Sequence, residues 1–266
     1  MTQPLFDARD EVSARIRLAS RCLVCLDFDG TLADFVGQPD DAYMPPETER
    51  ALRALTGHNN LTIAIVSGRD RIDLERRVGI AGVIYAGNHG MDISGPGVDF
   101  LEPSAAARVD KMHELAEVLC TRLQDIRHAI VEDKGLTISV HYRLVDESDR
   151  EELRRIVHAT LASADHPYVL VAGEKVHEIR PRVAWNKGSA VVWIREHLGQ
   201  PVPLPIYVGD DATDEDAFAA LREEGISVKV RTGTETAARY TLEGTAEVRG
   251  FLEWLDKVAV KGNGSG

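Results

Sequence analysis

Two carboxylates stand two residues apart where a short apolar run ends. The run extends from Cys22 to Phe28 and contains Asp27, while Asp29 and Gly30 follow it directly. In an extended chain Asp27 and Asp29 share a face, and Gly30 allows a sharp turn in which backbone N–H groups converge. One carboxylate can then attack while the other moves protons. Both would repel a phosphate unless a divalent cation lay between them, so the pattern predicts Mg²⁺.

An acidic turn or a calcium-binding loop is the structural alternative for this segment. The loop-type calcium motif has a third acidic residue before its glycine and a helix on either side. Here only Asp27 and Asp29 precede Gly30, and an apolar run precedes them. We therefore favour the catalytic interpretation.

Three further segments place polar side chains where a strand is expected to end or a helix to begin. Ser67 and Arg69 follow an apolar run, where a hydroxyl and backbone amides can grip phosphate oxygens. Lys187 lies at a helix start and can neutralise a transferred phosphoryl group. Asp210 ends another apolar run and is a better metal ligand than Asp214, which suits a helix N-cap. Each segment alone also fits a solvated turn, but together they mark the ligand-binding edge of an open α/β sheet.

The elements that must position these residues alternate between strands and helices. Continuous apolar runs predict buried strands, and helical spacing of apolar residues predicts the helices between them. The expected strands are 22–28, 61–66, 82–86, 137–142, 168–172, 176–179, 206–209 and 226–230, and the expected helices are 47–55, 70–78, 105–123, 147–162, 187–198, 214–221 and 251–260. This alternation is typical of an α/β fold with a doubly wound parallel sheet.

The alternation is interrupted in the middle of the chain. A long amphipathic pattern over 105–123 is followed by period-two alternation over 137–142, which is typical of a strand exposed on one face. We therefore predict a core domain formed by 1–100 and 181–266, and an inserted α+β domain formed by 101–180.

Composition and charge exclude several classes of protein. The chain has 266 residues, with 43 Asp and Glu against 31 Lys and Arg, and a formal net charge of −12. This balance argues against a sequence-independent nucleic-acid binder. No run approaches the roughly 18 apolar residues of a membrane helix, and the acidic segment from Met1 to Glu11 does not resemble a secretion signal. We expect a cytoplasmic monomer that acts on a small molecule and contacts neither nucleic acid nor membrane.

The three cysteines do not predict a disulfide framework or a metal site. Cys22 and Cys25 form a C-x-x-C sequence, but it lies inside the expected strand 22–28, and Cys120 is distant in sequence. Residues three apart in a strand point to opposite faces, so two such thiols cannot chelate one metal. Both are expected to be small core side chains.

The polar segments resemble the motifs of the haloacid-dehalogenase superfamily of phosphotransferases. Asp27-Phe28-Asp29-Gly30-Thr31 resembles its first motif, Ser67 its second, Lys187 its third, and Asp210 with Asp211 or Asp214 its fourth. The resemblance implies that Asp27 becomes phosphorylated and that Asp29 is the general acid and base. It also implies that Asp27, Asp29 through its backbone carbonyl, and Asp210 surround Mg²⁺, with Asp211 and Asp214 in a supporting role. The domain 101–180 would be a cap that excludes water and selects the substrate.

A narrower resemblance, to trehalose-6-phosphate phosphatases, extends from about Cys22 to Leu255. It is carried by Gly87-Asn88-His89-Gly90, Asp133-Lys134-Gly135, His141-Tyr142-Arg143, Gly173-Glu174-Lys175-Val176-His177-Glu178-Ile179-Arg180-Pro181 and Trp185-Asn186-Lys187-Gly188. It implies hydrolysis of trehalose 6-phosphate in trehalose biosynthesis. The expected substrate contacts are Thr31, Arg69, Asn88, His89, Lys134, His141, Arg143, Lys175 and Glu178. The sequence departs from the pattern at Asp34-Phe35, where a more apolar or proline-containing turn is expected.

Two alternatives remain at this stage. Within the enzyme class, the chain could be a capped phosphatase for another sugar phosphate, such as sucrose phosphate or a glycosylglycerate phosphate, because the cap decides the substrate. From another class, it could be a sugar-phosphate sensor or a phospho-acceptor signalling domain. A signalling domain needs no insertion of this size, and a degenerate sensor would be expected to lack Asp27 or Asp29.

Overall fold

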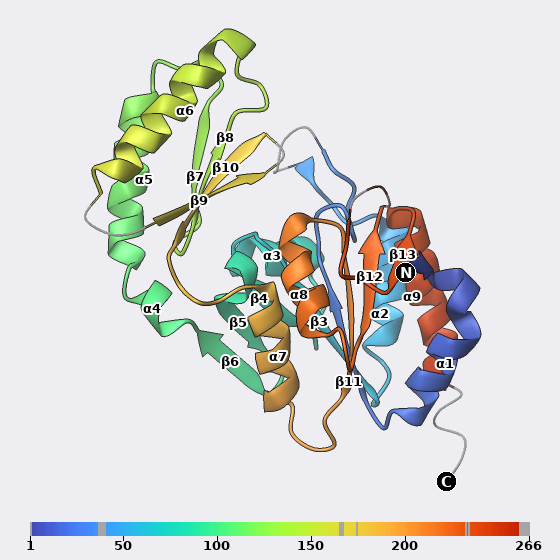
Figure 1. The fold of residues 1–266 in the computed structure, drawn as a ribbon. Coiled ribbons are helices and arrows are strands. Elements are labelled where there is room, and N and C mark those ends of the chain that lie inside the picture. Colours follow the sequence, from blue (N-terminus) through green and yellow to red (C-terminus); the bar gives the residue numbers. More distant parts are fainter. Residues whose placement is uncertain are drawn as a thin grey trace. The chain divides into compact units, whose positions relative to one another are not determined.

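The computed structural model describes residues 2–36, 41–164, 168–173, 175–231, 233 and 235–260. The chain divides into two compact units (Figure 1). The first unit combines Met1–Phe100 with Trp185–Gly266, and the second is Leu101–Ala184.

The first unit is built on one large sheet. Its strands within the described residues are β1 (Gln3–Pro4), β2 (Cys22–Leu26), β3 (Leu61–Val66), β4 (Ile84–Gly87), β5 (Asp92–Gly95), β6 (Val98–Leu101), β11 (Leu204–Gly209), β12 (Ile226–Val230) and β13 (Tyr240–Leu242). Their order across the sheet is β1-β13-β12-β11-β2-β3-β4-β5-β6. Pairing is parallel from β1 to β4, and β5 is antiparallel to β4. The predicted parallel sheet is therefore confirmed, with an added antiparallel edge.

Helices cover both faces of this sheet. They are α1 (Arg9–Leu18), α2 (Pro46–Leu55), α3 (Arg71–Val78), α7 (Lys187–His197), α8 (Glu215–Ala220) and α9 (Thr245–Val260). Side chains of α1, α2, α3 and α9 pack in one apolar cluster, and those of α7 and α8 pack in another (Figure 1). None of the helices in the described ranges is long and apolar enough to cross a membrane.

Strand β2 is buried on both faces, which explains its continuous apolar sequence. Successive residues alternate between the two apolar clusters: Cys22, Val24 and Leu26 belong to one, and Leu23 and Cys25 to the other. The prediction that the two thiols point to opposite faces is confirmed. Burial raises the pKa of the Cys22 thiol to about 11, so the thiol remains protonated at neutral pH.

The two points where the chain leaves and re-enters the first unit lie together. The rings of Phe100 and Trp185 stack with their centroids 4.6 Å apart. The Trp185 Nε1–H also donates to the carbonyl oxygen of Gly90 at 2.7 Å. Helix α7 begins two residues later, at Lys187. The start of α7 is thereby anchored to the sheet.

The second unit is an antiparallel sheet with helices packed on one face. Its described elements are α4 (Pro103–Ala106), α5 (Val109–Leu123), β7 (Ile130–Asp133), β8 (Ile138–His141), α6 (Glu147–Ala162), β9 (Tyr168–Gly173) and β10 (Val176–Pro181), with strand order β7-β8-β10-β9. Ile138, Val140 and Ile179 pack against the helices in one apolar cluster. The helix predicted over 105–123 is in fact two helices, because the chain leaves helical geometry between Ala106 and Val109.

Candidate active site

Polar side chains gather at one edge of the parallel sheet. Adjacent strands end at the same level, because Leu26 of β2 pairs with Ile65 of β3 and with Val208 of β11. The residues that follow the ends of β2, β3, β4 and β11 are Asp27, Ser67, Asn88 and Asp210. This is the edge at which open α/β sheets bind ligands.

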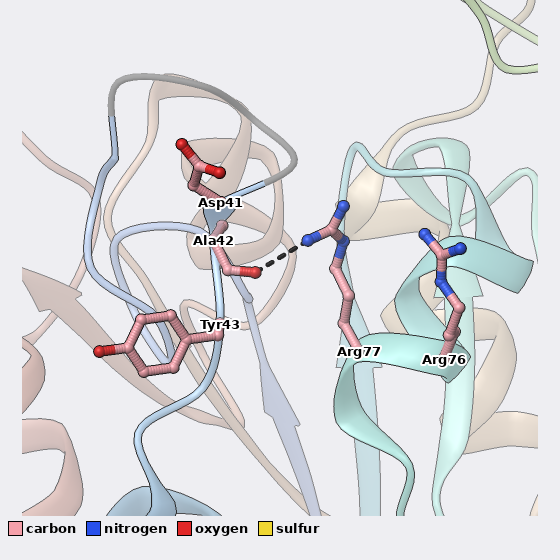
Figure 2. A pocket seen from close by; sticks show the side chains of 5 residues that line it. All are labelled: Asp41, Ala42, Tyr43, Arg76 and Arg77. Atoms are coloured by element: carbon pink, nitrogen blue, oxygen red, sulfur yellow. Dashed lines mark hydrogen bonds between the residues drawn. The ribbon is translucent and has the colours of Figure 1, made fainter.

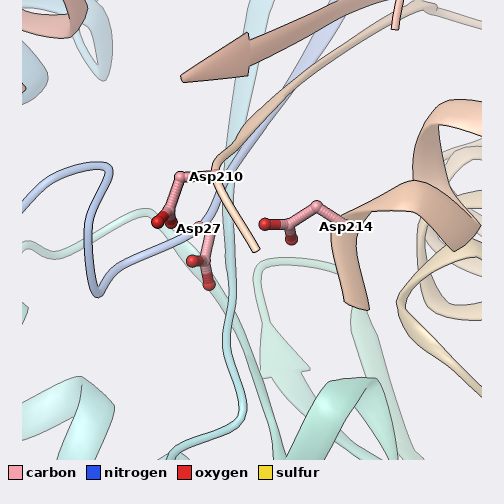
Figure 3. Close-up of side chains that lie close together, drawn as sticks. All are labelled: Asp27, Asp210 and Asp214. Carbon is pink, nitrogen blue, oxygen red and sulfur yellow. The ribbon is translucent and has the colours of Figure 1, made fainter. Parts of the chain in front are cut away.

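Three carboxylates form a cluster at this edge. Oxygen atoms of Asp27, Asp210 and Asp214 all lie within 4.8 Å of one another (Figure 3). Asp27 is 4% exposed and Asp214 is fully buried. Buried carboxylates at this spacing repel one another and require positive charge nearby.

Lys187 supplies one positive charge from the first residue of α7. Its Nζ donates to Asp27 Oδ1 at 2.9 Å and to Asp214 Oδ1 at 2.6 Å. The helix start is fixed by Asn186, whose Oδ1 accepts from the backbone N–H of Ser189 at 2.9 Å. Burial alone lowers the pKa of Lys187, but the charges of Asp214 and Asp27 outweigh it and raise the pKa. Lys187 is therefore a charged ammonium in contact with the proposed nucleophile.

One ammonium does not balance three carboxylates. Burial, assisted by Asp214 and Asp210, raises the pKa of Asp27 well above its ordinary value despite the opposing effect of Lys187. Burial and the charge of Asp214 raise the pKa of Asp210 to about 7. The three carboxylates also outnumber the one ammonium, which leaves an excess of negative charge at the cluster. Carboxylate oxygens are ligands that Mg²⁺ prefers, so the donor set fits a divalent cation.

The turn after β2 brings its backbone against this cluster. Gly30 has φ +81°, and a Cβ atom there would lie 2.3 Å from an Asp210 carboxylate oxygen. Only glycine allows both the left-handed conformation and the close approach. Next to it, the Thr31 hydroxyl donates to Asp210 Oδ1 at 3.3 Å. Thr31, which was predicted to bind substrate, thus contacts an acidic residue of the cluster.

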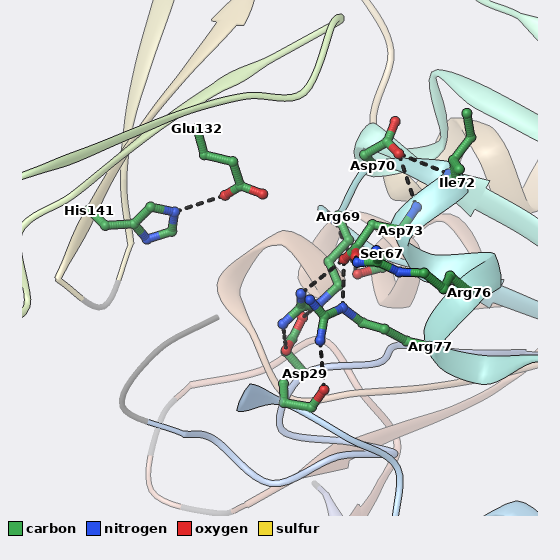
Figure 4. Close-up of polar contacts among 11 residues, drawn as sticks. Asp29, Ser67, Arg69, Asp70, Ile72, Asp73, Arg76, Arg77, Glu132 and His141 are labelled. Atoms are coloured by element: carbon green, nitrogen blue, oxygen red, sulfur yellow. Dashed lines mark hydrogen bonds and ion pairs between the residues drawn. The ribbon is translucent and has the colours of Figure 1, made fainter. Parts of the chain in front are cut away.

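Asp29 is held by Arg69 (Figure 4). The guanidinium makes two hydrogen bonds, from Nε to Oδ2 and from Nη2 to Oδ1, both at 2.7 Å. Arg69 also donates from Nη1 to Asp73 at 3.2 Å, at the start of α3. The side chain of Asp29 remains 32% exposed. The two predicted residues Asp29 and Arg69 are therefore brought together as an ion pair, with the carboxylate still accessible.

Ser67, Asn88 and His89 form a buried support beneath Arg69. The backbone N–H of Asn88 donates to the Arg69 carbonyl at 2.7 Å, and that of His89 donates to the Ser67 carbonyl at 2.8 Å. Asn88 and His89 both have positive φ, at 49° and 58°. A Cβ at Gly68 would lie 2.6 Å from the His89 ring, which shows how tightly this turn is packed.

Asp211 and Arg231 flank the acidic cluster. Asp211 is exposed and its side chain accepts from the backbone N–H of Ala212, as a helix cap does. Arg231 was not predicted: it follows β12, has φ +66°, and lies 3.9 Å from Asp210 with its guanidinium 4.6 Å above the Phe35 ring. Phe35, at which the sequence departs from the family pattern, thus packs against the Arg231 guanidinium beside the cluster.

In the second unit, charged side chains pair on the sheet face opposite the helices. Lys134 Nζ donates to Glu178 Oε1 at 2.9 Å, and Arg180 Nε donates to Glu178 Oε2 at 3.0 Å. His141 Nε2 lies 2.8 Å from Glu132 Oε2 (Figure 4). Glu132 and Arg180 were missed by the sequence analysis, although Arg180 lies two residues from the predicted Glu178 in β10 and so shares its strand face.

Two predicted substrate contacts of the second unit lie outside these pairs. Arg143 follows β8 and is half-buried, and Lys175 is exposed in the turn between β9 and β10, with φ +63°. The Lys175 carbonyl accepts from the backbone N–H of Tyr142 at 3.0 Å. The structure thus places both residues in loops at strand ends.

A cavity of about 440 Å³ lies elsewhere in the first unit, between α3 and the segment after β2 (Figure 2). It is lined by Asp41, Ala42, Tyr43, Arg76 and Arg77. Both arginines already contact Asp73, and Arg77 Nη1 also donates to the Ala42 carbonyl at 2.8 Å. Because no lining residue belongs to the acidic cluster, we place the reaction centre at the sheet edge instead.

Several known proteins are similar to this chain in sequence and in fold. A family model described as trehalose-phosphatase matches residues 25–246. A Mycobacterium tuberculosis protein named as an uncharacterized glycosyl hydrolase is 38% identical over 255 residues, which are 91% of this chain and 19% of that protein. The probable trehalose-phosphate phosphatase D of Arabidopsis thaliana is 37% identical over 263 residues, which are 92% of this chain and 70% of that protein. The C-terminal domain of a trehalose-6-phosphate phosphatase from C. albicans has a TM-score of 0.81 at 24% identity, covering 97% of this chain and 98% of that one.

The parallel sheet, with its acidic cluster and buried lysine at one edge, and the match to the trehalose-phosphatase family model place the chain in the haloacid-dehalogenase superfamily. This confirms the resemblance drawn from the four motifs. Within that superfamily the chain belongs to the trehalose-phosphatase family, whose model matches most of its length.

Proposed function

We propose that the chain hydrolyses trehalose 6-phosphate to trehalose and phosphate through a phosphorylated Asp27. The observation that carries the proposal is the position of Asp27, buried at the sheet edge with the Lys187 ammonium 2.9 Å from its Oδ1. A carboxylate nucleophile must approach a phosphate that is also negative, and a fixed ammonium offsets their repulsion. The relatives named as trehalose-phosphate phosphatases support the choice of substrate.

We assign a divalent cation, Mg²⁺, to the carboxylates of Asp27 and Asp210 and the backbone carbonyl of Asp29. Three carboxylates with one ammonium carry a formal charge of −2, which matches the charge of such an ion. When bound, Mg²⁺ supplies charge neutralisation to the phosphoryl oxygens. The Arg231 guanidinium, 3.9 Å from Asp210, supplies further positive charge beside the cluster.

The proposed reaction has two steps, and each conserves its protons. In the first, an Asp27 oxygen attacks phosphorus, the bond between phosphorus and the sugar oxygen breaks, and Asp29 gives its proton to that oxygen. In the second, water attacks phosphorus and gives a proton to Asp29, while the bond to Asp27 breaks. Lys187 and Ser67 contact the phosphoryl oxygens throughout. The partial exposure of Asp29 is consistent with its access to both the sugar oxygen and water.

We assign recognition of the sugar to the second unit. Its pairs Lys134 with Glu178 and His141 with Glu132 offer donors and acceptors on the sheet face opposite helices α5 and α6. A disaccharide presents many hydroxyl groups, which such charged pairs can bind through charge-assisted hydrogen bonds. Arg143 and Lys175 would add further donors from the loops.

Phosphate release from a panel of sugar phosphates tests this function. We expect release from trehalose 6-phosphate in Mg²⁺, at a kcat/KM at least about 100-fold above that for glucose 6-phosphate or sucrose 6-phosphate, because about 3 kcal/mol of sugar contacts would be absent. Removal of divalent metal with a chelator should abolish release, and added Mg²⁺ should restore it. Full activity after chelation would contradict the assigned cation. Higher kcat/KM for another sugar phosphate would reassign the substrate.

Lys134→Met tests the assignment of the second unit. We expect KM for trehalose 6-phosphate to rise about 10-fold with little change in kcat, since a charged hydrogen bond to the sugar is lost. The Glu178 side chain should keep its position, because Arg180 still donates to it and neutralises its charge. The control is Lys111→Met on α5, an exposed lysine whose Nζ donates to Glu114 Oε2 at 2.6 Å. Equal KM values for the wild-type protein and Lys134→Met would remove Lys134 from the sugar site.

A further inference from the structure

A tyrosine hydroxyl lies inside the sheet, below the acidic cluster. Tyr207 belongs to β11, is fully buried, and packs its ring edge-on against Phe218 at 5.8 Å between centroids. The hydroxyl donates to Asp214 Oδ1 at 2.7 Å. Burial, together with the charges of Asp214 and Asp27, raises the pKa of Tyr207, so the hydroxyl keeps its proton and remains a donor.

Asp214 is held at both of its carboxylate oxygens. Oδ1 accepts from Tyr207 and from the Lys187 ammonium, at 2.7 and 2.6 Å. Oδ2 accepts from the backbone N–H of Asp211 at 2.8 Å. Three donors therefore fix a carboxylate that is completely buried. These three donors distinguish Asp214 from Asp27, which accepts from Lys187 at 2.9 Å, and from Asp210, whose contacts with Thr31 and Arg231 are longer.

We propose that Tyr207 is a positioning residue of the phosphoryl-transfer site: it fixes Asp214, and through Asp214 it directs the Lys187 ammonium at Asp27. Tyr207 acts on the reaction only through these two residues. The proposal rests on the function proposed above, because it takes Asp27 as the nucleophile. The proposal also gives the three carboxylates different roles. Asp27 and Asp210 can bind a cation, whereas Asp214 holds the Lys187 ammonium.

The alternative assigns Asp214 to the metal, since its oxygens lie within 4.8 Å of those of Asp27 and Asp210. The two assignments differ in what the loss of the tyrosine hydroxyl does. If Asp214 holds the lysine, the affinity for Mg²⁺ should hardly change, and the placement of the phosphoryl group should suffer. If Asp214 is a metal ligand, loss of the Tyr207 hydroxyl should also change the affinity for Mg²⁺.

Tyr207→Phe removes the hydroxyl and keeps the packed ring. We expect kcat for trehalose 6-phosphate to fall about 10-fold at unchanged KM, because the ammonium is less well directed at the transition state. Calorimetric titration with beryllium fluoride in Mg²⁺, which forms an analogue of the phosphorylated carboxylate, should show about 10-fold weaker binding. Titration with Mg²⁺ alone should give a dissociation constant within about twofold of that of the wild-type protein.

Tyr240→Phe is the matched control. Tyr240 is also fully buried in the same sheet, and its hydroxyl also contacts a carboxylate, that of Glu11 at 2.9 Å, but it takes no part in the cluster. The Tyr240→Phe substitution should lower the unfolding temperature as Tyr207→Phe does, while leaving kcat and beryllium fluoride binding unchanged. The assays are made well below both unfolding temperatures, so a loss of fold cannot imitate the effect.

Wild-type kcat and wild-type beryllium fluoride affinity in Tyr207→Phe would overturn the positioning role. Weaker binding of Mg²⁺ alone would overturn the division of tasks, because it would make Asp214 a metal ligand. A wild-type protein that releases no phosphate from any sugar phosphate would refute the proposed function instead. The beryllium fluoride titration would still test Tyr207 in that case, since it requires no substrate.

Discussion

Asp27→Asn should reduce turnover of trehalose 6-phosphate by at least about 10⁴-fold, because an amide cannot form the phosphorylated intermediate. The fold should persist. Asp27 repels Asp210 and Asp214 within the cluster, and a neutral side chain of the same shape relieves this repulsion. Phosphate release and the unfolding temperature, measured on the same preparation, check both parts of the expectation.

Asp34→Asn is the control for this substitution. Asp34 lies in the same loop, but its Oδ1 accepts from the Thr245 hydroxyl at 2.7 Å and not from any group of the cluster. Its substitution should leave kcat within about twofold of the wild-type value, as is usual for surface changes. Substantial activity of Asp27→Asn at saturating Mg²⁺ would exclude a phosphorylated Asp27.

Lys187→Met should abolish turnover and also destabilise the protein, by about 3–5 kcal/mol in the free energy of unfolding. The ammonium is 2% exposed and is the shared partner of Asp27 and Asp214, so its loss leaves buried negative charge without a counter-ion. Urea unfolding and phosphate release measure the two effects. Added Mg²⁺ should recover part of the stability of the variant, because a second source of positive charge then occupies the cluster.

Lys257→Met, a lysine change in the last turn of α9, provides the reference for a lysine outside the cluster. It should alter the free energy of unfolding by no more than about 0.5 kcal/mol. If Lys187→Met kept wild-type stability, the three carboxylates would not depend on the ammonium, and the charge balance inferred for the site would be wrong.

Much of the fold could be predicted because buried parallel strands have a simple sequence pattern. β2, β3 and β11 are continuous apolar runs, and each is followed at once by the polar residue that reaches the sheet edge. Parallel strands end at a common edge, so four separate motifs could be placed at one site before any coordinates were known. The structure brings Asp27, Lys187 and Asp210 together at that edge.

Other elements have weaker patterns. β1 and β13 contain two and three residues, which is too short for a periodicity, and their pairing is set by contacts between the two ends of the chain. Half of the residues of helix α1 are charged, and it buries only Val12, Ser13 and Ile16. Nothing in the local sequence indicated these elements, because their stability comes from packing against distant residues.

The same limit applies to the site. Tyr207 lies within the apolar run of β11, where an aromatic residue indicates a core position, and its hydrogen bond to Asp214 depends on the turn that follows the strand. Asp214 was interpreted as a helix cap, and its Oδ2 does accept from the Asp211 backbone. The sequence could not indicate that its other oxygen accepts from a lysine 27 residues earlier in the chain.

The stacked rings of Phe100 and Trp185 have a consequence for the position of Lys187. The chain leaves the first unit at Phe100 and returns to it at Trp185, and Lys187 follows two residues later. Because these contacts hold the start of α7 within the first unit, we expect changes in the length or sequence of the inserted segment to leave Lys187 in place.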